Sequence, residues 1–164
     1  MTEIGRSDTA AGDAERVAGM VAAAARHWLG EETAVLARRC ELRPALPICT
    51  AAGALEGWFV PVVAGDRLAA YLRFTSEGAR RGLSLFMQRP GALETCPPLA
   101  DWLDRTRVMA RAQALAHAGE RAGEPMLSFD RSPERLAWRV PLRDGQGHAR
   151  PVFVAGAQAW PGAA

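Results

Sequence analysis

A 17-residue window of this chain recurs, without a gap, 80 positions later. Residues 58–74 read WFVPVVAGDRLAAYLRF, and residues 138–154 read WRVPLRDGQGHARPVFV. Both windows begin with the pattern W-x-V-P-[VL] and carry a glycine at the same place, Gly65 and Gly145, between two segments of β type. The pattern predicts a strand, a tight turn and a returning strand, used twice. The repeat constrains the fold and leaves the chemistry open.

Each copy of the window is accompanied by a predicted helix and further strands. Apolar residues from Val17 to Trp28 follow one helical stripe, which predicts a helix that Asp13 caps. A second helix is predicted over residues 99–118, because Pro97 and Pro98 suit a first helical turn. The predicted strands are residues 57–63, 67–74 and 82–87 in the first half, and 126–130, 136–142 and 150–155 in the second. Residues 40–46 could form another strand, although the prolines there favour an edge strand or a loop.

These elements predict an α+β fold of two helix-plus-antiparallel-meander units (αβββ-αβββ) related by the internal repeat. Residues 1–12 are expected to form a disordered N-terminus, and residues 13–88 the first half. Residues 89–98 are a Pro/Gly connector, and residues 99–161 the second half. At 164 residues, the two halves are expected to pack as one compact domain.

The arginine content reflects the base composition of the coding sequence more than it indicates a charged binding partner. All 20 are arginine, and the chain has neither lysine nor asparagine, which is typical of a GC-rich bacterial coding sequence. The net charge is +2, and arginines alternate with acidic residues, so no nucleic-acid partner is expected. The apolar run over residues 17–25 is too short to span a bilayer, and no secretory signal is recognised. Three cysteines without a secreted context favour free thiols, hence a cytoplasmic protein without a membrane partner.

The second half resembles the PepSY domain, a small cystatin-like α+β unit. The residues that carry this resemblance are AHAGERAGEPMLSFD at 116–130 and LAWRVPLRDGQGHARPVFVAGAQAW at 136–160. It covers roughly residues 100–160 and reaches the first half only through the internal repeat. Gly156 and Ala157 stand where that family often has an acidic residue. The resemblance implies a non-catalytic module that binds or inhibits a partner.

Candidate reactive residues are few. Cys40, Cys49 and Cys96 lack the short paired spacing of zinc ligands, so no metal site is predicted. Cys96 precedes a predicted helix, where a thiol pKa can fall, and His117 or His148 could serve as its base. Structural roles compete with this hypothesis, since a histidine in the last turn of a helix stabilises the helix dipole.

Acid–base chemistry has one candidate pair, Asp130 with Tyr71, the only tyrosine. The sequence that follows Asp130 favours a turn instead. Trp58 and Trp138 share a strand face with Val60 and Val140. They either fill the core or line, with Tyr71, a concave sheet face that binds a peptide or an apolar ligand.

Motifs for nucleotide binding, zinc hydrolysis and serine hydrolysis are missing from the sequence, and no cofactor is expected. The sequence therefore favours a non-catalytic bacterial accessory protein. It would bind a protein or peptide partner through a sheet edge or a concave sheet face, and could form a homodimer. The alternative is a small-molecule-binding protein or enzyme, with a pocket that the curved sheet encloses around Trp58, Tyr71 and Trp138.

Overall fold

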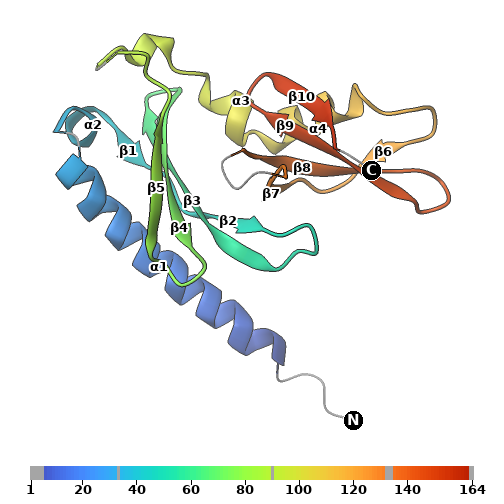
Figure 1. Cartoon of the computed structure of the whole chain (residues 1–164), viewed down its shortest axis with the longest axis horizontal. Coiled ribbons are helices and arrows are strands. Elements are labelled where there is room, and N and C mark those ends of the chain that lie inside the picture. Colours follow the sequence, from blue (N-terminus) through green and yellow to red (C-terminus); the bar gives the residue numbers. More distant parts are fainter. Residues whose placement is uncertain (1–5, 33, 90, 132–134, 163–164) are drawn as a thin grey trace.

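The computed structural model describes residues 6–32, 34–89, 91–131 and 135–162 (Figure 1). Its helices are α1 (Arg6–Glu32), α2 (Ala34–Arg39), the short 3₁₀ helix η1 (Leu93–Thr95), α3 (Leu99–Leu103) and α4 (Arg105–Gln113). The strands of the first half are β1 (Glu41–Leu42), β2 (Leu46–Cys49), β3 (Leu55–Ala64), β4 (Arg67–Thr75) and β5 (Arg80–Leu85). Those of the second half are β6 (Arg121–Ala122), β7 (Met126–Phe129), β8 (Leu136–Arg143), β9 (Ala149–Ala155) and β10 (Gln158–Pro161).

These ten strands belong to one mixed sheet, in the order β10-β9-β8-β7-β2-β3-β4-β5, with β1 paired to β3 and β6 to β8. All pairs are antiparallel except β2–β7, which pair in parallel at Ile48 and Leu127. The α+β class is confirmed, but the prediction of two helix-plus-meander units (αβββ-αβββ) was wrong. The predicted meanders are parts of a single sheet, because β2 joins the first half to β7. The sequence did not predict this central strand, since the prolines near it favoured an edge strand or a loop.

Strands of the two halves keep the offset of the sequence repeat. β1 begins at Glu41 and β6 at Arg121, while β2 begins at Leu46 and β7 at Met126; each pair of starts is 80 positions apart. β1 and β6 make the same kind of contact, since each pairs with the long strand that carries the W-x-V-P pattern. The correspondence between the halves thus includes short strands outside the recognised window.

Two core clusters lie on opposite faces of β3 and β4. Trp58 and Phe59 are neighbours in β3, so they point to opposite faces. Trp58 belongs to the cluster under α1, whose other members include Val21, Ala25, Trp28, Val60, Val62, Leu72 and Phe74. Phe59 belongs to a cluster shared with α3, α4 and the second half, which includes Tyr71, Trp102, Val108, Trp138, Val140, Leu142 and Val152. β3 and β4 are therefore buried on both faces over most of their length, and α1 lies alongside one of these faces (Figure 1).

The helices differ in their bounds from the sequence prediction. α1 begins at Arg6, upstream of Asp13, and the first five residues of the predicted disordered terminus lie outside the described residues. The predicted helix over residues 99–118 is broken at Asp104, which has an extended backbone. Its carboxylate accepts hydrogen bonds from the backbone N–H groups of Thr106 (2.9 Å) and Arg107 (3.3 Å), which makes it the N-cap of α4. Among the described residues, no helix is both long and apolar enough to cross a membrane.

Candidate functional site

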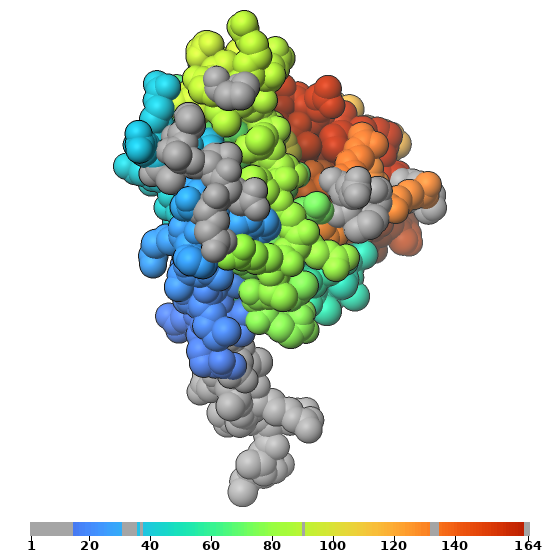
Figure 2. Space-filling model, turned by 60° about the vertical axis from the view of Figure 1, so that its left-hand side comes forward, coloured from blue at the N-terminus to red at the C-terminus, as the bar shows by residue number. Residues whose placement is uncertain are grey.

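The sheet ends in two edge strands, β5 and β10, and they differ in what they offer to another chain. β5 lies at the surface, beside α1 and in front of the second half (Figure 2). An edge strand exposes backbone N–H and C=O groups that can pair with another strand, unless side chains or proline prevent it. Which residues expose these groups follows from the hydrogen-bond register of each edge.

On β5, the outward-facing backbone groups belong to Leu83 and Leu85. The N–H of Phe86 donates to the carbonyl of Ala69 on β4 (3.0 Å), and Ser84 pairs with Tyr71. In an antiparallel ladder, alternate residues bond to the same neighbour. Phe86 and Ser84 therefore face β4, and the N–H and C=O groups of Leu83 and Leu85 face away from it.

On β10, the same reasoning gives a blocked edge. The N–H of Gly162 donates to the carbonyl of Pro151 (2.8 Å), and Trp160 pairs with Phe153 on β9. The outward-facing positions are therefore Ala159 and Pro161. Because Pro161 has no N–H, this edge lacks one of its donors, as is typical of edges that resist strand addition. β5 has no proline and keeps both donors.

Arginines from β5 reach both faces of the sheet. Arg80 lies over the ring of Trp28, with its guanidinium carbon 5.3 Å from the ring centroid. Leu83 packs against the cluster under α1, and strict alternation would place Arg81 on that face as well. A register shift opposite Arg73 and Phe74 inserts one residue, and Arg81 lines the cleft on the other face. β-bulges commonly re-aim a side chain in this way.

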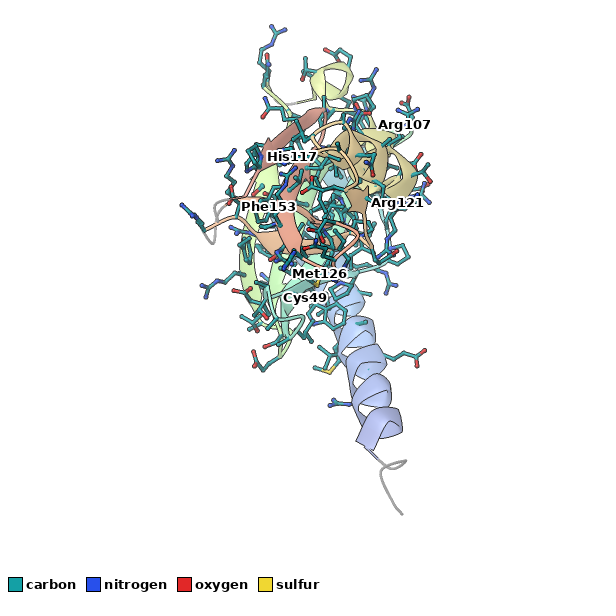
Figure 3. The ribbon with its side chains drawn as sticks, turned by 90° about the vertical axis from the view of Figure 1, so that its right-hand side faces the viewer. Cys49, Arg107, His117, Arg121, Met126 and Phe153 are labelled. Carbon is teal, nitrogen blue, oxygen red and sulfur yellow. The ribbon has the colours of Figure 1, made fainter. Side chains whose placement is uncertain are left out.

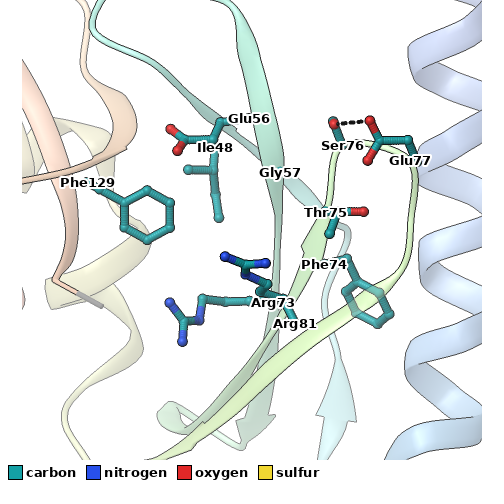
Figure 4. A pocket seen from close by; sticks show the side chains of 10 residues that line it. All are labelled: Ile48, Glu56, Gly57, Arg73, Phe74, Thr75, Ser76, Glu77, Arg81 and Phe129. Atoms are coloured by element: carbon teal, nitrogen blue, oxygen red, sulfur yellow. Dashed lines mark hydrogen bonds between the residues drawn. The ribbon is translucent and has the colours of Figure 1, made fainter. Parts of the chain in front are cut away.

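That cleft lies where the two halves of the sheet separate. Because β2 and β7 pair only at Ile48 and Leu127, the strands diverge beyond this point. A cleft of about 260 Å³ lies between these two strands and the strands β3, β4 and β5, and Figure 4 shows the side chains that line it. Its lining residues are Ile48, Glu56, Gly57, Arg73, Phe74, Thr75, Ser76, Glu77, Arg81 and Phe129. We refer to it as the Arg73/Arg81 cleft, since both guanidinium groups project into it toward Phe129 (Figure 4).

Two glycines shape this cleft. A Cβ on Gly82 would lie 3.1 Å from Nη2 of Arg73, so the Arg73 side chain extends from β4 and its guanidinium lies over β5. A Cβ on Gly57 would lie 2.5 Å from the backbone oxygen of Phe74, a distance that no side chain tolerates. The close approach of β3 and β4 at the floor of the cleft thus requires glycine at position 57.

The predicted binding residues are not gathered in one cavity. Trp58 lies in the cluster under α1, and its Nε1 donates to the carbonyl of Ser76 (3.3 Å). Tyr71 and Trp138 lie in the other cluster, where Tyr71 packs on Phe59 with ring centroids 4.9 Å apart. The indole N–H of Trp138 donates to the carbonyl of Trp102. The structure therefore brings Tyr71 and Trp138 into one cluster and places Trp58 on the opposite face of β3.

The cysteines are in environments that suppress thiolate chemistry. Burial raises the pKa of Cys96, which is 1 % exposed, and nearby Glu94 raises it further against the opposing effect of Arg67. Burial also raises the pKa of Cys40 and of Cys49, of which Cys49 is labelled in Figure 3. Within the described part of the chain, no group of three His, Cys, Asp or Glu residues could hold a metal ion.

The candidate bases lie away from Cys96 in exposed turns. His117, labelled in Figure 3, follows α4, which ends at Gln113, and its backbone N–H donates to the Glu120 carboxylate (2.7 Å). His148 Nδ1 lies 3.1 Å from Asp144 Oδ2 within a turn. Cys96 is enclosed in the cluster under α1, so neither histidine is in a position to accept its proton.

Asp130 closes the turn between β7 and β8. Its backbone N–H donates to the carbonyl of Arg135 (3.0 Å), and its carboxylate accepts from Nε1 of Trp160 (2.7 Å). Arg135 also lies over the Trp160 ring, 4.1 Å from the centroid. Asp130 is thus engaged with β10 and the turn, whereas Tyr71 packs among aromatic rings near α3. The structure does not join the two as an acid–base pair.

Arg150 and Glu120 form a doubly hydrogen-bonded pair that ties β9 to the turn before β6. Arg150 Nε and Nη2 donate to the two carboxylate oxygens at 2.8 and 2.7 Å. Chiefly because of these bonds, and also because of the His117 N–H, the pKa of Glu120 falls from 4.5 to about 2. A bidentate pair of this kind favours the ionised carboxylate.

The Glu120 pair makes the stability depend on pH in a defined window. Since its folded pKa lies below its unfolded value, the stabilisation is present above pH 4.5 and is lost as the pH falls toward 2. We expect the urea midpoint of the wild type to exceed that of Glu120→Gln at pH 6, and the difference to shrink between pH 4.5 and 2. Arg150→Met should reproduce the same narrowing. A difference that stays constant across this range contradicts the assignment.

Sequence reasoning did not find the β5 edge or the Arg73/Arg81 cleft. The separate signals were visible, namely an Arg-Arg-Gly run at residues 80–82 and a glycine before Trp58. That these residues surround one cleft depends on the curvature of the sheet and on the contact between β2 and β7, which the sequence does not show. Comparison with models of protein families, with curated proteins and with solved structures gives no match.

Proposed function

We propose that this chain is a non-catalytic accessory protein that binds an extended segment of a protein partner as an added strand on β5. The observation that carries the proposal is the outward-facing backbone of Leu83 and Leu85 on an edge strand without proline, in contrast to the proline-blocked edge of β10. A strand-binding role needs no reactive side chain. This agrees with the raised thiol pKa values and with the structural engagement of Asp130.

The side chains around β5 define the chemistry of the partner. Leu85 is 52 % exposed at the edge, and an added strand would cover it with apolar side chains. Arg80 and Arg81 place positive charge at the other end of the strand, which favours acidic residues in the partner. The backbone hydrogen bonds at Leu83 and Leu85 contribute only about 0.5–1.5 kcal/mol each, so these side-chain contacts are required for useful affinity.

Hydrogen exchange checks the edge without knowledge of the partner. In the free protein, we expect the amides of Leu83 and Leu85 to exchange much faster than those of Ser84 and Phe86, which donate to β4. Site-resolved exchange measured by NMR gives this comparison directly. Equal protection of all four amides would show that another segment covers the edge, and would contradict the proposal.

Partner capture at defined positions tests the proposal itself. A photo-crosslinking amino acid at Leu85, introduced in native cells, should yield one partner whose crosslinked residues fall in a single extended segment. The same amino acid at Leu115, which is 36 % exposed outside the sheet, is the matched control. A synthetic peptide of the captured segment should protect the amides of Leu83 and Leu85. Identical products at both positions, or crosslinks between two copies of this chain, contradict the proposal.

Leu83→Pro tests the contribution of one edge N–H to partner binding. The Leu83 N–H faces away from β4, so proline removes an edge donor without breaking a bond to β4. We expect the captured peptide to lose at least about tenfold in affinity, as measured by titration, since each tenfold corresponds to about 1.4 kcal/mol. Ser84→Pro is the reference, because it removes a β4 bond and should lower the unfolding midpoint much more. Unchanged peptide binding by folded Leu83→Pro rules out strand addition at β5.

A further inference from the structure

The Arg73/Arg81 cleft adjoins β5 on the face opposite α1, so a strand added to β5 would run along its rim. Adjacent strands lie about 4.8 Å apart. Arg81 belongs to β5 itself, and the guanidinium of Arg73 lies over Gly82, also on β5. A side chain of the added strand that points to this face is therefore one strand spacing from both guanidinium groups.

We propose that this cleft binds a carboxylate of the partner segment, which assigns it as the specificity site of the strand-addition function proposed above. Two guanidinium groups that converge on one space match the two oxygens of a carboxylate. Ile48 and Phe129 form an apolar wall that suits the aliphatic part of a glutamate side chain. That the carboxylate belongs to an added strand rests on the proposed function. That the cleft binds a carboxylate rests on the residues of the cleft alone.

The acidic residues of the cleft select the charge of the ligand. Glu56 and Glu77 line the same space, and the pKa of Glu77 is lowered, chiefly by the hydroxyl of Ser76 (2.8 Å). Glu77 is turned toward α1 (Figure 4), so Glu56 is the acidic residue that lowers the net positive charge around the two guanidinium groups, and a dianion such as phosphate is disfavoured relative to a monoanionic carboxylate. The ligand is therefore an Asp or Glu side chain, or the carboxyl terminus of the segment.

The β-bulge makes the two arginines of β5 a matched pair for a test. Arg80 and Arg81 are neighbours with the same charge, yet Arg80 lies over Trp28 on the α1 face and Arg81 lines the cleft. General electrostatic attraction would depend on both equally. Of these two arginines of β5, binding inside the cleft depends only on Arg81.

The test uses the full chain and three synthetic hexapeptides, titrated by NMR. The first peptide, Ac-TVEVTV-NH2, places a glutamate on the cleft face and valines beside Leu83 and Leu85. The second, Ac-TVQVTV-NH2, is the neutral control. The third, Ac-TVQVTV with a free carboxyl terminus, tests whether a terminal carboxylate binds in place of a side-chain carboxylate. We expect the glutamate or the free-carboxyl peptide to bind about tenfold more tightly than the neutral control. Whichever of the two is preferred identifies the source of the carboxylate. Arg81→Gln should erase the preference, and Arg80→Gln should retain it.

The possible failures are distinguishable. Equal affinity for all three peptides, with loss in Leu83→Pro, overturns the cleft assignment and leaves strand addition intact. Equal effects of Arg80→Gln and Arg81→Gln also overturn it. If no peptide binds, sodium acetate is titrated alone. Shifts of the Arg81 Nε–H signal would then support carboxylate binding in the cleft and count against strand addition at β5. The absence of shifts would count against both proposals. Stronger displacement of the glutamate peptide by inorganic phosphate than by acetate contradicts the selection of a monoanion.

Discussion

Replacing Trp138 with alanine is expected to lower the free energy of unfolding by about 3–5 kcal/mol. The side chain is 3 % exposed, packs in the cluster shared by both halves, and donates its indole N–H to the carbonyl of Trp102. The substitution removes a large buried surface and leaves that carbonyl without its donor. Urea denaturation followed by circular dichroism measures the loss.

Trp138→Phe is the control for the two contributions. It keeps most of the buried surface and removes the hydrogen bond, so we expect a smaller loss of about 1–3 kcal/mol. This comparison also tests the alternative in which Trp138 lines a ligand pocket. A loss below about 1 kcal/mol for Trp138→Ala contradicts the core role and favours the ligand-binding alternative.

The sequence repeat was sufficient to predict the strands that form the long hairpins. The W-x-V-P pattern and its glycine turn correspond to β3–β4 and β8–β9, because alternation and turn chemistry are local signals. The short strands β1 and β6 carry only two residues each and have no such signal. The parallel contact between Ile48 and Leu127 joins residues that are distant in sequence, which no local pattern reports.

The candidate site depended on the same long-range information. Trp58 and Trp138 share a strand face with Val60 and Val140, and were predicted either to fill the core or to line, with Tyr71, a concave sheet face. Equivalent residues of the two halves nevertheless lie in different clusters, with Trp58 under α1 and Trp138 beside Trp102. Likewise, the identity of the outward-facing residues of β5 follows from its register with β4 and cannot be read from composition.

Gly57→Ala is expected to destabilise the protein by about 3 kcal/mol, which is large for the addition of one methyl group. The new Cβ would lie 2.5 Å from the backbone oxygen of Phe74, and this atom cannot rotate away as a side chain can. β3 and β4 must then separate at the floor of the Arg73/Arg81 cleft. We expect a lower urea midpoint together with shifted NMR signals for Arg73 and Arg81.

Gly145→Ala is the matched control, since Gly145 occupies a turn of the second half and nothing lies within 4 Å of its Cβ position. It should change stability by no more than about 0.5 kcal/mol. If Gly57→Ala were equally mild, β3 and β4 would not approach as closely as described, and the floor of the cleft would accept side chains. The position of Arg73 over Gly82 would then lose its geometric support, because the strand that carries Arg73 could shift. A large loss confined to Gly57→Ala instead ties the shape of the cleft to the backbone contact between these two strands.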